Sequence, residues 1–248
     1  DIVAIVFMTI CSLPFAVMIL ALHGDFGGFR RDPQLRIWVG MAVIFTLAIA
    51  AYIAGRPEVN ITDEGALRMA AFNVVSILSG TGYGTHDFGL WGPFASSLFI
   101  LFMFLGGTAG SASCGMKTFR VHVSLLALRS YALSMIRPNR VAPVRYAGKI
   151  VREETMQSIM LFMFLFLASF AVLACALALT GLDPTTAISG AAASICNVGP
   201  GLGEIIGPAG TYQPLPDTAK WLCAIAMLLG RLELISVFVI LSPSFWRS

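Results

Sequence analysis

Long apolar runs separated by short polar segments make up most of this chain. A helix needs about 20 apolar residues to cross about 30 Å of hydrocarbon. We therefore predict membrane-spanning helices at residues 2–22, 37–54, 94–105 with a continuation beyond a glycine break, 159–180 and 221–241. Two shorter apolar stretches, 66–78 and 185–196, are too short to span and suit half-helices that enter the membrane and turn back.

Both half-helices carry signals of a helix start. Asp63 and Glu64 precede the first, and acidic residues favour the positive end of a helix dipole. Asp183-Pro184 opens the second, as an N-cap and a first-turn proline do. A glycine-rich loop follows each half-helix, SGTGYGTHD (79–87) in one case and NVGPGLG (197–203) in the other. The pattern of long helix, half-helix, glycine loop and long helix thus occurs twice.

This duplication predicts an all-α integral membrane protein with two tandem helix–pore helix–filter loop–helix repeats, potassium-channel-like, preceded by one extra transmembrane helix. A potassium-channel pore is surrounded by four filter loops. This chain supplies two, so two copies of the chain or a further part of a longer chain must complete the ring. The unpaired helix at 2–22 favours a parent chain of four repeats. We then expect residues 1–34 to be the last helix of a preceding repeat with its cytoplasmic loop, 35–136 the third pore repeat and 137–248 the fourth.

Composition supports the membrane assignment. The chain is 57% hydrophobic and only 12% charged, whereas a soluble domain is about a quarter charged. A net charge of +3 gives no argument for nucleic acid as a partner. The five cysteines are scattered without a CxxC pair, and the three histidines lie far apart, so we expect no disulfide, no metal cofactor and no catalytic site.

Basic residues in the loops predict the orientation. Residues 117–152 carry eight Lys and Arg and, before Glu153, no acid, and residues 23–36 carry three Arg, so both segments should be cytoplasmic. The loops on the other side are net acidic. The basic face at 117–152 suits anionic membrane lipid or a partner protein, and a merely solvated surface accounts for it equally well.

The two glycine loops align as x-x-Gly-x-Gly, with Gly80–Gly84 matching Asn197–Gly201. Potassium filters use carbonyl oxygens from loops of the TVGYG kind in place of the ion's hydration shell. Non-helical backbone at membrane depth is tolerated where it lines a water-filled path. We expect potassium to bind at Gly80, Thr81, Asn197 and Val198. The filter residues predicted in full are Ser79, Gly80, Thr81, Gly82, Tyr83, Cys196, Asn197, Val198 and Gly199.

A second glycine-rich stretch, at 106–115, interrupts the run that starts at 94. It resembles a phosphate loop only weakly, because Met116 separates Gly115 from Lys117 and no strand precedes it. Two readings stay open, a close helix-packing face and a break that forms an intramembrane gate. We expect the gate, built from Gly106, Gly107, Gly110, Ser111 and Gly115.

Arg231 lies roughly 21 Å along the predicted last span at 1.5 Å per residue. An arginine at that depth should face a cavity or a partner. Glu233 is two residues on and points to another side of the helix, so it is a poor partner within the helix. A structural ion pair with a distant acid is the plainer reading. We expect instead that Arg231 faces the pore below the filter and belongs to the gate.

Four stretches resemble the TrkH/TrkG/KtrB family of bacterial potassium-uptake proteins, and the TrkH type above all: SGTGYGTHD, FLGGTAGSASCGMKTFR, NVGPGLGE and LLGRLELISV. The resemblance implies a multi-pass protein of the bacterial inner membrane that conducts potassium, often rubidium, through one pore per subunit. It also implies four pore repeats, a homodimer, a TrkA-like cytoplasmic regulatory subunit that binds nucleotide, and a gating arginine. The family has Thr where this chain has Ser79 and Gly80, which leaves the side-chain contribution there open.

Two other functions remain. An ion-coupled secondary symporter with a midplane site would use the same broken helices. A non-conducting scaffold would have no need of glycine-rich backbone at that depth. The paired loops therefore favour conduction over a scaffold, while coupling to protons or sodium is not visible in the sequence.

Overall fold

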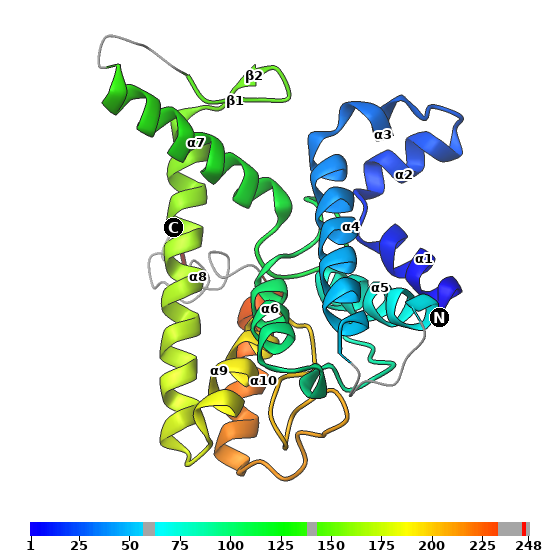
Figure 1. Ribbon diagram of the computed structural model, residues 1–248. Helices are drawn as coiled ribbons and strands as arrows, with labels where there is room; N and C mark the ends of the chain where they lie inside the picture. Colours follow the sequence, from blue (N-terminus) through cyan, green and yellow to red (C-terminus); the bar gives the residue numbers. More distant parts are fainter. Residues whose placement is uncertain (57–62, 138–142, 233–244, 247–248) are drawn as a thin grey trace.

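The computed structural model describes residues 1–56, 63–137, 143–232 and 245–246, and helices dominate it (Figure 1). The helices α4 and α8 stand roughly upright in Figure 1, with α6 and α9 between them. The elements are α1 (Ile2–Cys11), α2 (Phe15–Leu22), α3 (Gly27–Arg31), α4 (Pro33–Ala54), α5 (Asp63–Ser79), the 3-10 helix η1 (Phe88–Trp91), α6 (Pro93–Phe104), α7 (Thr118–Ile136), β1 (Arg145–Tyr146), β2 (Lys149–Ile150), α8 (Glu153–Leu179), α9 (Pro184–Ile195) and α10 (Asp217–Arg231).

The predicted repeats are present. Within the described residues, two helices are each long and apolar enough to cross a membrane on their own, α4 and α8. The half-helices are α5 and α9, and Asp183 caps α9 by accepting a hydrogen bond from the Thr186 N–H at 3.0 Å. Helix α10 begins at Asp217, and the predicted continuation to 241 falls on residues 233–244, outside the described part. We call α4–α6 the N-terminal repeat and α8–α10 the C-terminal repeat.

The prediction of one continuous helix at 2–22 is wrong. The structure breaks it into α1 and α2, which are bent by 107° and together form either a broken span or a re-entrant pair. Pro14 has no N–H to donate and disfavours helical backbone in the residue before it, so α1 ends at Cys11 and Pro14 starts α2. We call residues 12–14 the elbow.

A small β-hairpin lies between α7 and α8 in this otherwise helical fold. Strands β1 and β2 pair antiparallel, with Tyr146 opposite Lys149. Ala147 and Gly148 connect them with φ of 47° and 80°. Two successive left-handed residues make the type I′ turn that suits the twist of a two-residue hairpin.

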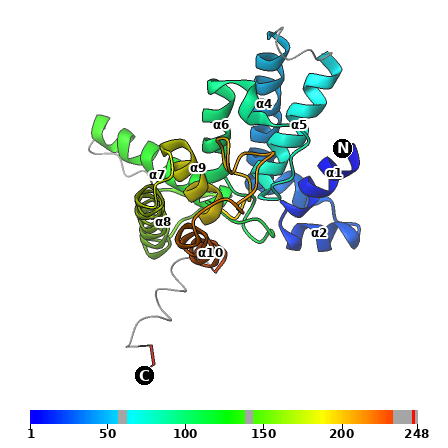
Figure 2. The same cartoon turned by 90° about the horizontal axis from the view of Figure 1, so that it is seen from below.

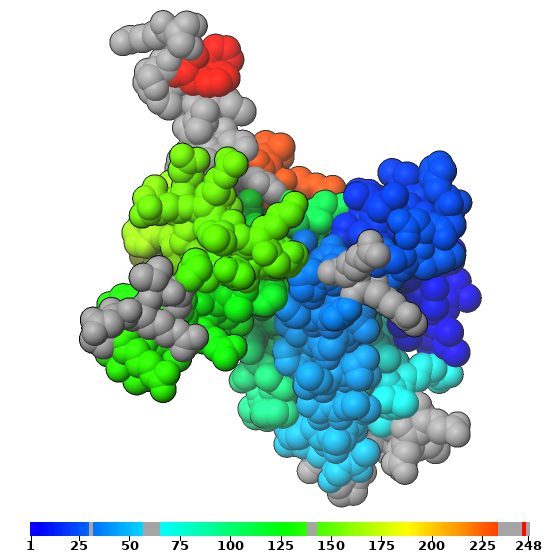
Figure 3. Space-filling model, turned by 90° about the horizontal axis from the view of Figure 1, so that it is seen from above, coloured from blue at the N-terminus to red at the C-terminus, as the bar shows by residue number. Residues whose placement is uncertain are grey.

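The two basic segments lie at the same end of the molecule. Figure 1 shows α2 and α3 at the top on one side, and α7 with the hairpin at the top on the other. The view from above shows the same separation, with the blue N-terminal helices across α4 from the green α7 (Figure 3). The segments between α5 and α6 and between α9 and α10 lie toward the opposite end. Residues 23–36 and the described part of 117–152 therefore share one end of the molecule, and the cytoplasmic location of that end stays a prediction.

Aromatic side chains fill the core of the N-terminal repeat. Phe88 and Phe99 stack with ring centroids 4.2 Å apart, and Phe45 stacks on Phe102 at 4.3 Å. Phe88, Phe99 and Phe102 are fully buried. The packing fixes η1 and α6 against α4, and thereby fixes the C-terminal end of the segment that follows α5.

Candidate functional site

Helix α5 ends in a Schellman C-cap. The Gly80 N–H donates to the Ile77 carbonyl at 3.0 Å, and the Thr81 N–H donates to the Ser76 carbonyl at 2.9 Å. Gly80 has a φ of 70°, the left-handed conformation that this cap requires at its turning residue. Gly82 is also left-handed, with a φ of 74°. The first glycine loop (79–84) therefore leaves the helix with two left-handed residues separated by one.

Helix α9 ends in the same way. The Asn197 N–H donates to the Ser194 carbonyl at 3.1 Å, and the Val198 N–H donates to the Ala193 carbonyl at 2.9 Å. Asn197 has a φ of 53° and Gly199 a φ of 108°. Asparagine is the residue that most often replaces glycine at this position. The second glycine loop (196–201) thus repeats the cap and the alternation of the first.

The two glycine loops touch. A Cβ added at Gly82 would overlap the Val198 carbonyl oxygen and would lie 2.9 Å from Cδ of Pro200. Seen from below, the chain after α9, gold to orange, lies between α5 and α10 (Figure 2). The predicted filter residues of both repeats are therefore brought together at one place.

Side chains of the first glycine loop bond to one another. The hydroxyl groups of Ser79 and Thr81 lie 2.7 Å apart, and the Ser79 hydroxyl also donates to the Ser76 carbonyl at 3.0 Å. Tyr83 is 65% exposed, so its ring stands outside the packed core. Where the family pattern has threonine, this chain thus uses Ser79 to tie the loop and Gly80 to turn it.

Residues outside the motif fix the second glycine loop. The Asn197 side-chain amide donates to the Met227 carbonyl of α10 at 2.9 Å, and the Tyr212 hydroxyl donates to the Gly199 carbonyl at 2.7 Å. Cys196, the first residue of the loop, is buried. The C-terminal repeat therefore ties its loop to α10 and to the segment before α10.

The break after α6 is confirmed. The chain is non-helical from 105 to 117, which we call the break loop. The Gly106 N–H donates to the Met116 carbonyl at 3.0 Å, and the Met116 N–H donates to the Phe104 carbonyl at 3.0 Å. The Thr118 hydroxyl donates to the Gly106 carbonyl at 3.1 Å. These bonds close the two ends of the loop, so the alternative of a glycine face on a continuous helix is wrong.

The break loop is held by the elbow on one side. The Ser12 carbonyl accepts hydrogen bonds from the Thr108 hydroxyl at 2.8 Å and from the Thr108 N–H at 3.2 Å. The Phe15 N–H donates to the Gly110 carbonyl at 3.0 Å. Backbone groups within a membrane must find partners in the protein. The two interrupted helices therefore satisfy each other's free backbone groups.

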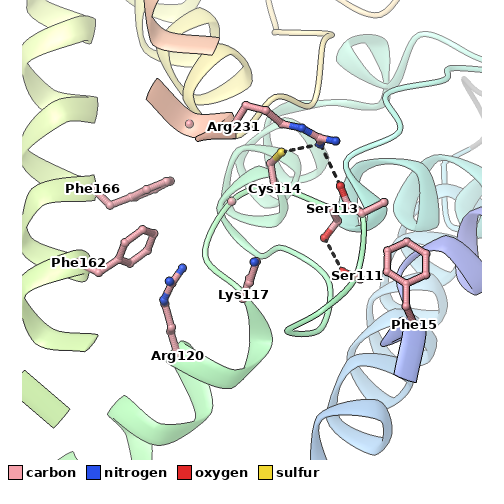
Figure 4. A pocket seen from close by; sticks show the side chains of 12 residues that line it. Phe15, Ser111, Ser113, Cys114, Lys117, Arg120, Phe162, Phe166 and Arg231 are labelled. Atoms are coloured by element: carbon pink, nitrogen blue, oxygen red, sulfur yellow. Dashed lines mark hydrogen bonds between the residues drawn. The ribbon is translucent and has the colours of Figure 1, made fainter. Parts of the chain in front are cut away.

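Arg231 holds the other side of the break loop (Figure 4). Its guanidinium donates from Nη1 to the Ala112 carbonyl at 3.0 Å and to Sγ of Cys114 at 3.1 Å. The sequence assigns Arg231 and this loop to one gate; the structure brings the two into contact, and the gating role stays a prediction. Glu233 lies outside the described residues.

A cavity of about 370 Å³ opens beside this contact. Ser111 and Ser113 of the break loop line it, together with Arg231 and with Lys117 and Arg120 at the start of α7. Figure 4 shows these side chains converging between α8 and the elbow, with Phe15 at one edge. The Arg120 guanidinium lies 3.8 Å from the ring centre of Phe162 on α8.

A second cavity, of about 430 Å³, lies beyond the glycine loops at the opposite end. Asp87 and Glu204 both line it. Each acid is three residues after the last glycine of the aligned x-x-Gly-x-Gly segment, Gly84 or Gly201, so the pair follows the duplication. Two carboxylates at corresponding places give this cavity a negative potential that attracts cations.

Sequence reasoning missed three parts of this site. Asp87 and Glu204 belong to the loops described above only as net acidic, although the alignment of the glycine loops pairs them. The elbow was hidden in a uniformly apolar run, and Pro14 was its signal. Tyr212 lies in a segment without periodicity or motif, and no signal in the sequence marked it.

Comparison with known proteins agrees with this geometry. A family model described as "Cation transport protein", TrkH, matches residues 2–248. The Trk system potassium uptake protein TrkI of Halomonas elongata is 42% identical over 97% of this chain and 48% of its own length. The Trk system potassium uptake protein TrkH of Vibrio parahaemolyticus is 29% identical over 100% of this chain and 51% of its own length.

The fold matches as well. The crystal structure of the potassium transporter TrkH from Vibrio parahaemolyticus superposes with a TM-score of 0.90 at 28% identity, covering 98% of this chain and 52% of that one. The chain spans about half the length of the curated relatives it matches. It is a helical membrane protein. The chain belongs to the TrkH family of cation transport proteins.

Proposed function

We propose that this chain forms part of a pathway for potassium uptake across the bacterial inner membrane. The observation that carries the proposal is the contact between two duplicated glycine loops, in which Gly82 faces the Val198 carbonyl oxygen. Two relatives that match nearly all of this chain are named potassium uptake proteins. An enzymatic function has no comparable support.

Backbone carbonyls of the two loops select the ion. Alternating left-handed residues turn successive peptide planes in a way that a helix or strand cannot. Carbonyl oxygens of Gly80, Thr81, Asn197 and Val198 then replace part of the hydration shell of a potassium ion, as carbonyl rings do in potassium filters. The second cavity, which Asp87 and Glu204 line, raises the local concentration of cations in front of the filter.

The break loop and Arg231 form the gate. The loop spans the space between the elbow and α10, and Arg231 fixes it through the Ala112 carbonyl at 3.0 Å. A positive charge in the path also repels an arriving cation. Opening requires Arg231 to release the loop or to move aside, so the two hydrogen bonds of its guanidinium stabilise the closed state.

The complete assembly includes more than this chain. We propose that it carries four pore repeats, forms a homodimer and spans the membrane several times. A nucleotide-binding regulatory subunit binds at the basic end, where the hairpin and α7 lie opposite α2 and α3 (Figure 3). Anionic lipid head groups neutralise the remaining basic residues at that end.

Flux in proteoliposomes tests the proposal. The full-length transporter is reconstituted, and rubidium uptake is measured with potassium or sodium as competitor. We expect potassium to compete at least tenfold better than sodium, without a proton or sodium gradient. Uptake that requires such a gradient would instead support the ion-coupled symporter. Absence of uptake in correctly inserted protein would reject both.

A further inference from the structure

The two glycine loops are held in place by different means. Gly82 is held by packing, because the Val198 carbonyl oxygen and Pro200 fill the space beside it. At Gly199, the corresponding residue, no described residue other than its two chain neighbours lies within 4 Å of the place that a Cβ would occupy. Packing therefore limits the first loop at its central glycine and leaves the second loop open there.

The Tyr212 hydroxyl supplies the missing restraint. It donates to the Gly199 carbonyl at 2.7 Å, the usual distance for a well-formed O–H···O hydrogen bond. A hydroxyl has one proton to donate, so this bond uses the whole donor capacity of Tyr212. The ring of Pro200 fixes φ on the far side of this peptide, so ψ of Gly199 is the torsion left to turn the carbonyl, and glycine restricts it less than any other residue does.

Tyr212 is itself fixed. Its ring packs against the buried cluster around Leu177 and Cys223, which joins α8, α9 and α10. The Thr211 N–H donates to the Ile205 carbonyl at 3.1 Å, and the Leu215 N–H donates to the Tyr212 carbonyl at 3.3 Å. The hydroxyl therefore connects the glycine loop to a rigid part of the C-terminal repeat.

We propose that Tyr212 is a selectivity-determining positioning residue, which holds the Gly199 peptide so that the neighbouring carbonyls keep the spacing that suits potassium. The inference rests on the proposed function. Selectivity among cations depends on the number, orientation and stiffness of the coordinating carbonyl dipoles. A freed Gly199 carbonyl would turn toward water or the ion and change the coordination at Val198.

The test replaces Tyr212 by Phe in the full-length transporter, which removes the hydroxyl and keeps the ring. We expect the ratio of potassium to sodium competition in rubidium uptake to fall about fivefold, the order set by one net hydrogen bond. The amount of protein in the membrane should stay near that of the wild type. Tyr131→Phe, at an exposed position on α7, is the matched control and should leave the ratio unchanged.

A wild-type ratio in well-inserted Tyr212→Phe would overturn the inference, even if its thermal stability drops, because a purely structural tyrosine affects stability alone. If the variant gives too little flux to measure, the melting temperature of the purified protein is measured with potassium and with sodium. The difference between the two melting temperatures should be smaller in Tyr212→Phe than in the wild type, and an unchanged difference overturns the inference. Failure of the wild type to take up potassium would reject the proposed function, which is a separate outcome.

Discussion

The Val198 carbonyl oxygen occupies the space that a side chain at Gly82 would need. Each glycine loop therefore limits the position of the other, although the two are far apart in sequence. A substitution at this contact therefore displaces both loops at once. Comparing substitutions at Gly82 and at Gly199 separates steric overlap from backbone strain.

Gly82→Ala should be more harmful than Gly199→Ala. Both positions have positive φ, so alanine is strained at either. At Gly82 the new methyl also overlaps the Val198 carbonyl. At Gly199 no described residue other than the two chain neighbours lies within 4 Å of the new methyl. We expect Gly82→Ala to lose at least tenfold in potassium-over-sodium competition and Gly199→Ala a few-fold, measured by rubidium uptake.

Gly148→Ala is the control for backbone strain, because it places alanine at a positive φ of 80° in the hairpin, away from the glycine loops. It should leave selectivity unchanged. Full selectivity in well-inserted Gly82→Ala would contradict the filter assignment.

Arg231→Ala should raise potassium uptake or lower its apparent Michaelis constant. The variant removes both the charge and the hydrogen bonds to Ala112 and Cys114. Arg231→Lys keeps the charge and should keep much of the barrier. Lys220→Ala on the same helix, where Lys220 pairs with Asp217, serves as the control. Unchanged uptake with lower thermal stability would make Arg231 a structural residue.

Thr108→Val should also raise uptake, by about two- to fivefold. It removes the hydroxyl that donates to Ser12 and keeps the shape of the side chain. Thr108→Ser retains a hydroxyl and should restore the wild-type rate. A deletion of residues 106–113 is a blunter test, because it would leave the Ser12 carbonyl and the Phe15 N–H without partners. Equal rates in Thr108→Val and the wild type would show that the elbow does not restrain the gate.

Asp87→Asn with Glu204→Gln should raise the apparent Michaelis constant for potassium about twofold at low ionic strength. Asparagine can still accept the hydrogen bond from Gly89, so the start of η1 is preserved. The difference should vanish at high ionic strength, where the Debye length is a few ångströms. Glu154→Gln, at the start of α8, is the control. A defect that persists at high salt would indicate a direct binding role instead of attraction.

Asp183 should make the stability of α9 sensitive to acid. The side chain of Thr186 and then its backbone N–H hold the pKa of this carboxyl below its usual value. Because the folded pKa is the lower one, the stabilisation is present above about pH 3.9 and is lost as the pH falls through the folded value. Asp183→Ala should therefore lower the melting temperature at pH 7, and this difference should shrink in strongly acidic buffer. A constant difference would show that the charge contributes nothing.

Local chemistry explains which elements could be predicted. Asp183-Pro184 specifies the start of α9, and Gly80 and Asn197 mark the ends of the half-helices, because each acts on neighbouring backbone groups. The elbow at Ser12 was missed, since the apolar run continues through it and the bonds that stabilise the bend come from Thr108, far along the chain.

Contacts between distant segments explain what could not be predicted. The hydrogen bond from Tyr212 to Gly199 depends on the path of the folded segment between α9 and α10, which shows no periodicity. Asn197 likewise reaches Met227 only because α9 and α10 pack together. The turn at Ala147-Gly148 puts a non-glycine residue in a left-handed position, so its sequence carried only half of the usual signal.

The matched caps of α5 and α9 also have an electrostatic consequence. Both half-helices present their carboxyl ends to the place where the glycine loops meet, and the aligned peptide dipoles of a helix sum to about half a negative charge at that end. The caps engage some terminal carbonyls but leave the direction of the dipoles unchanged. A dehydrated cation between the loops would gain attraction from two helices without any ionised side chain beside it, and an anion would be repelled. The ends of two half-helices thus favour positive ions over anions at this place, independently of the selectivity proposed for the carbonyls.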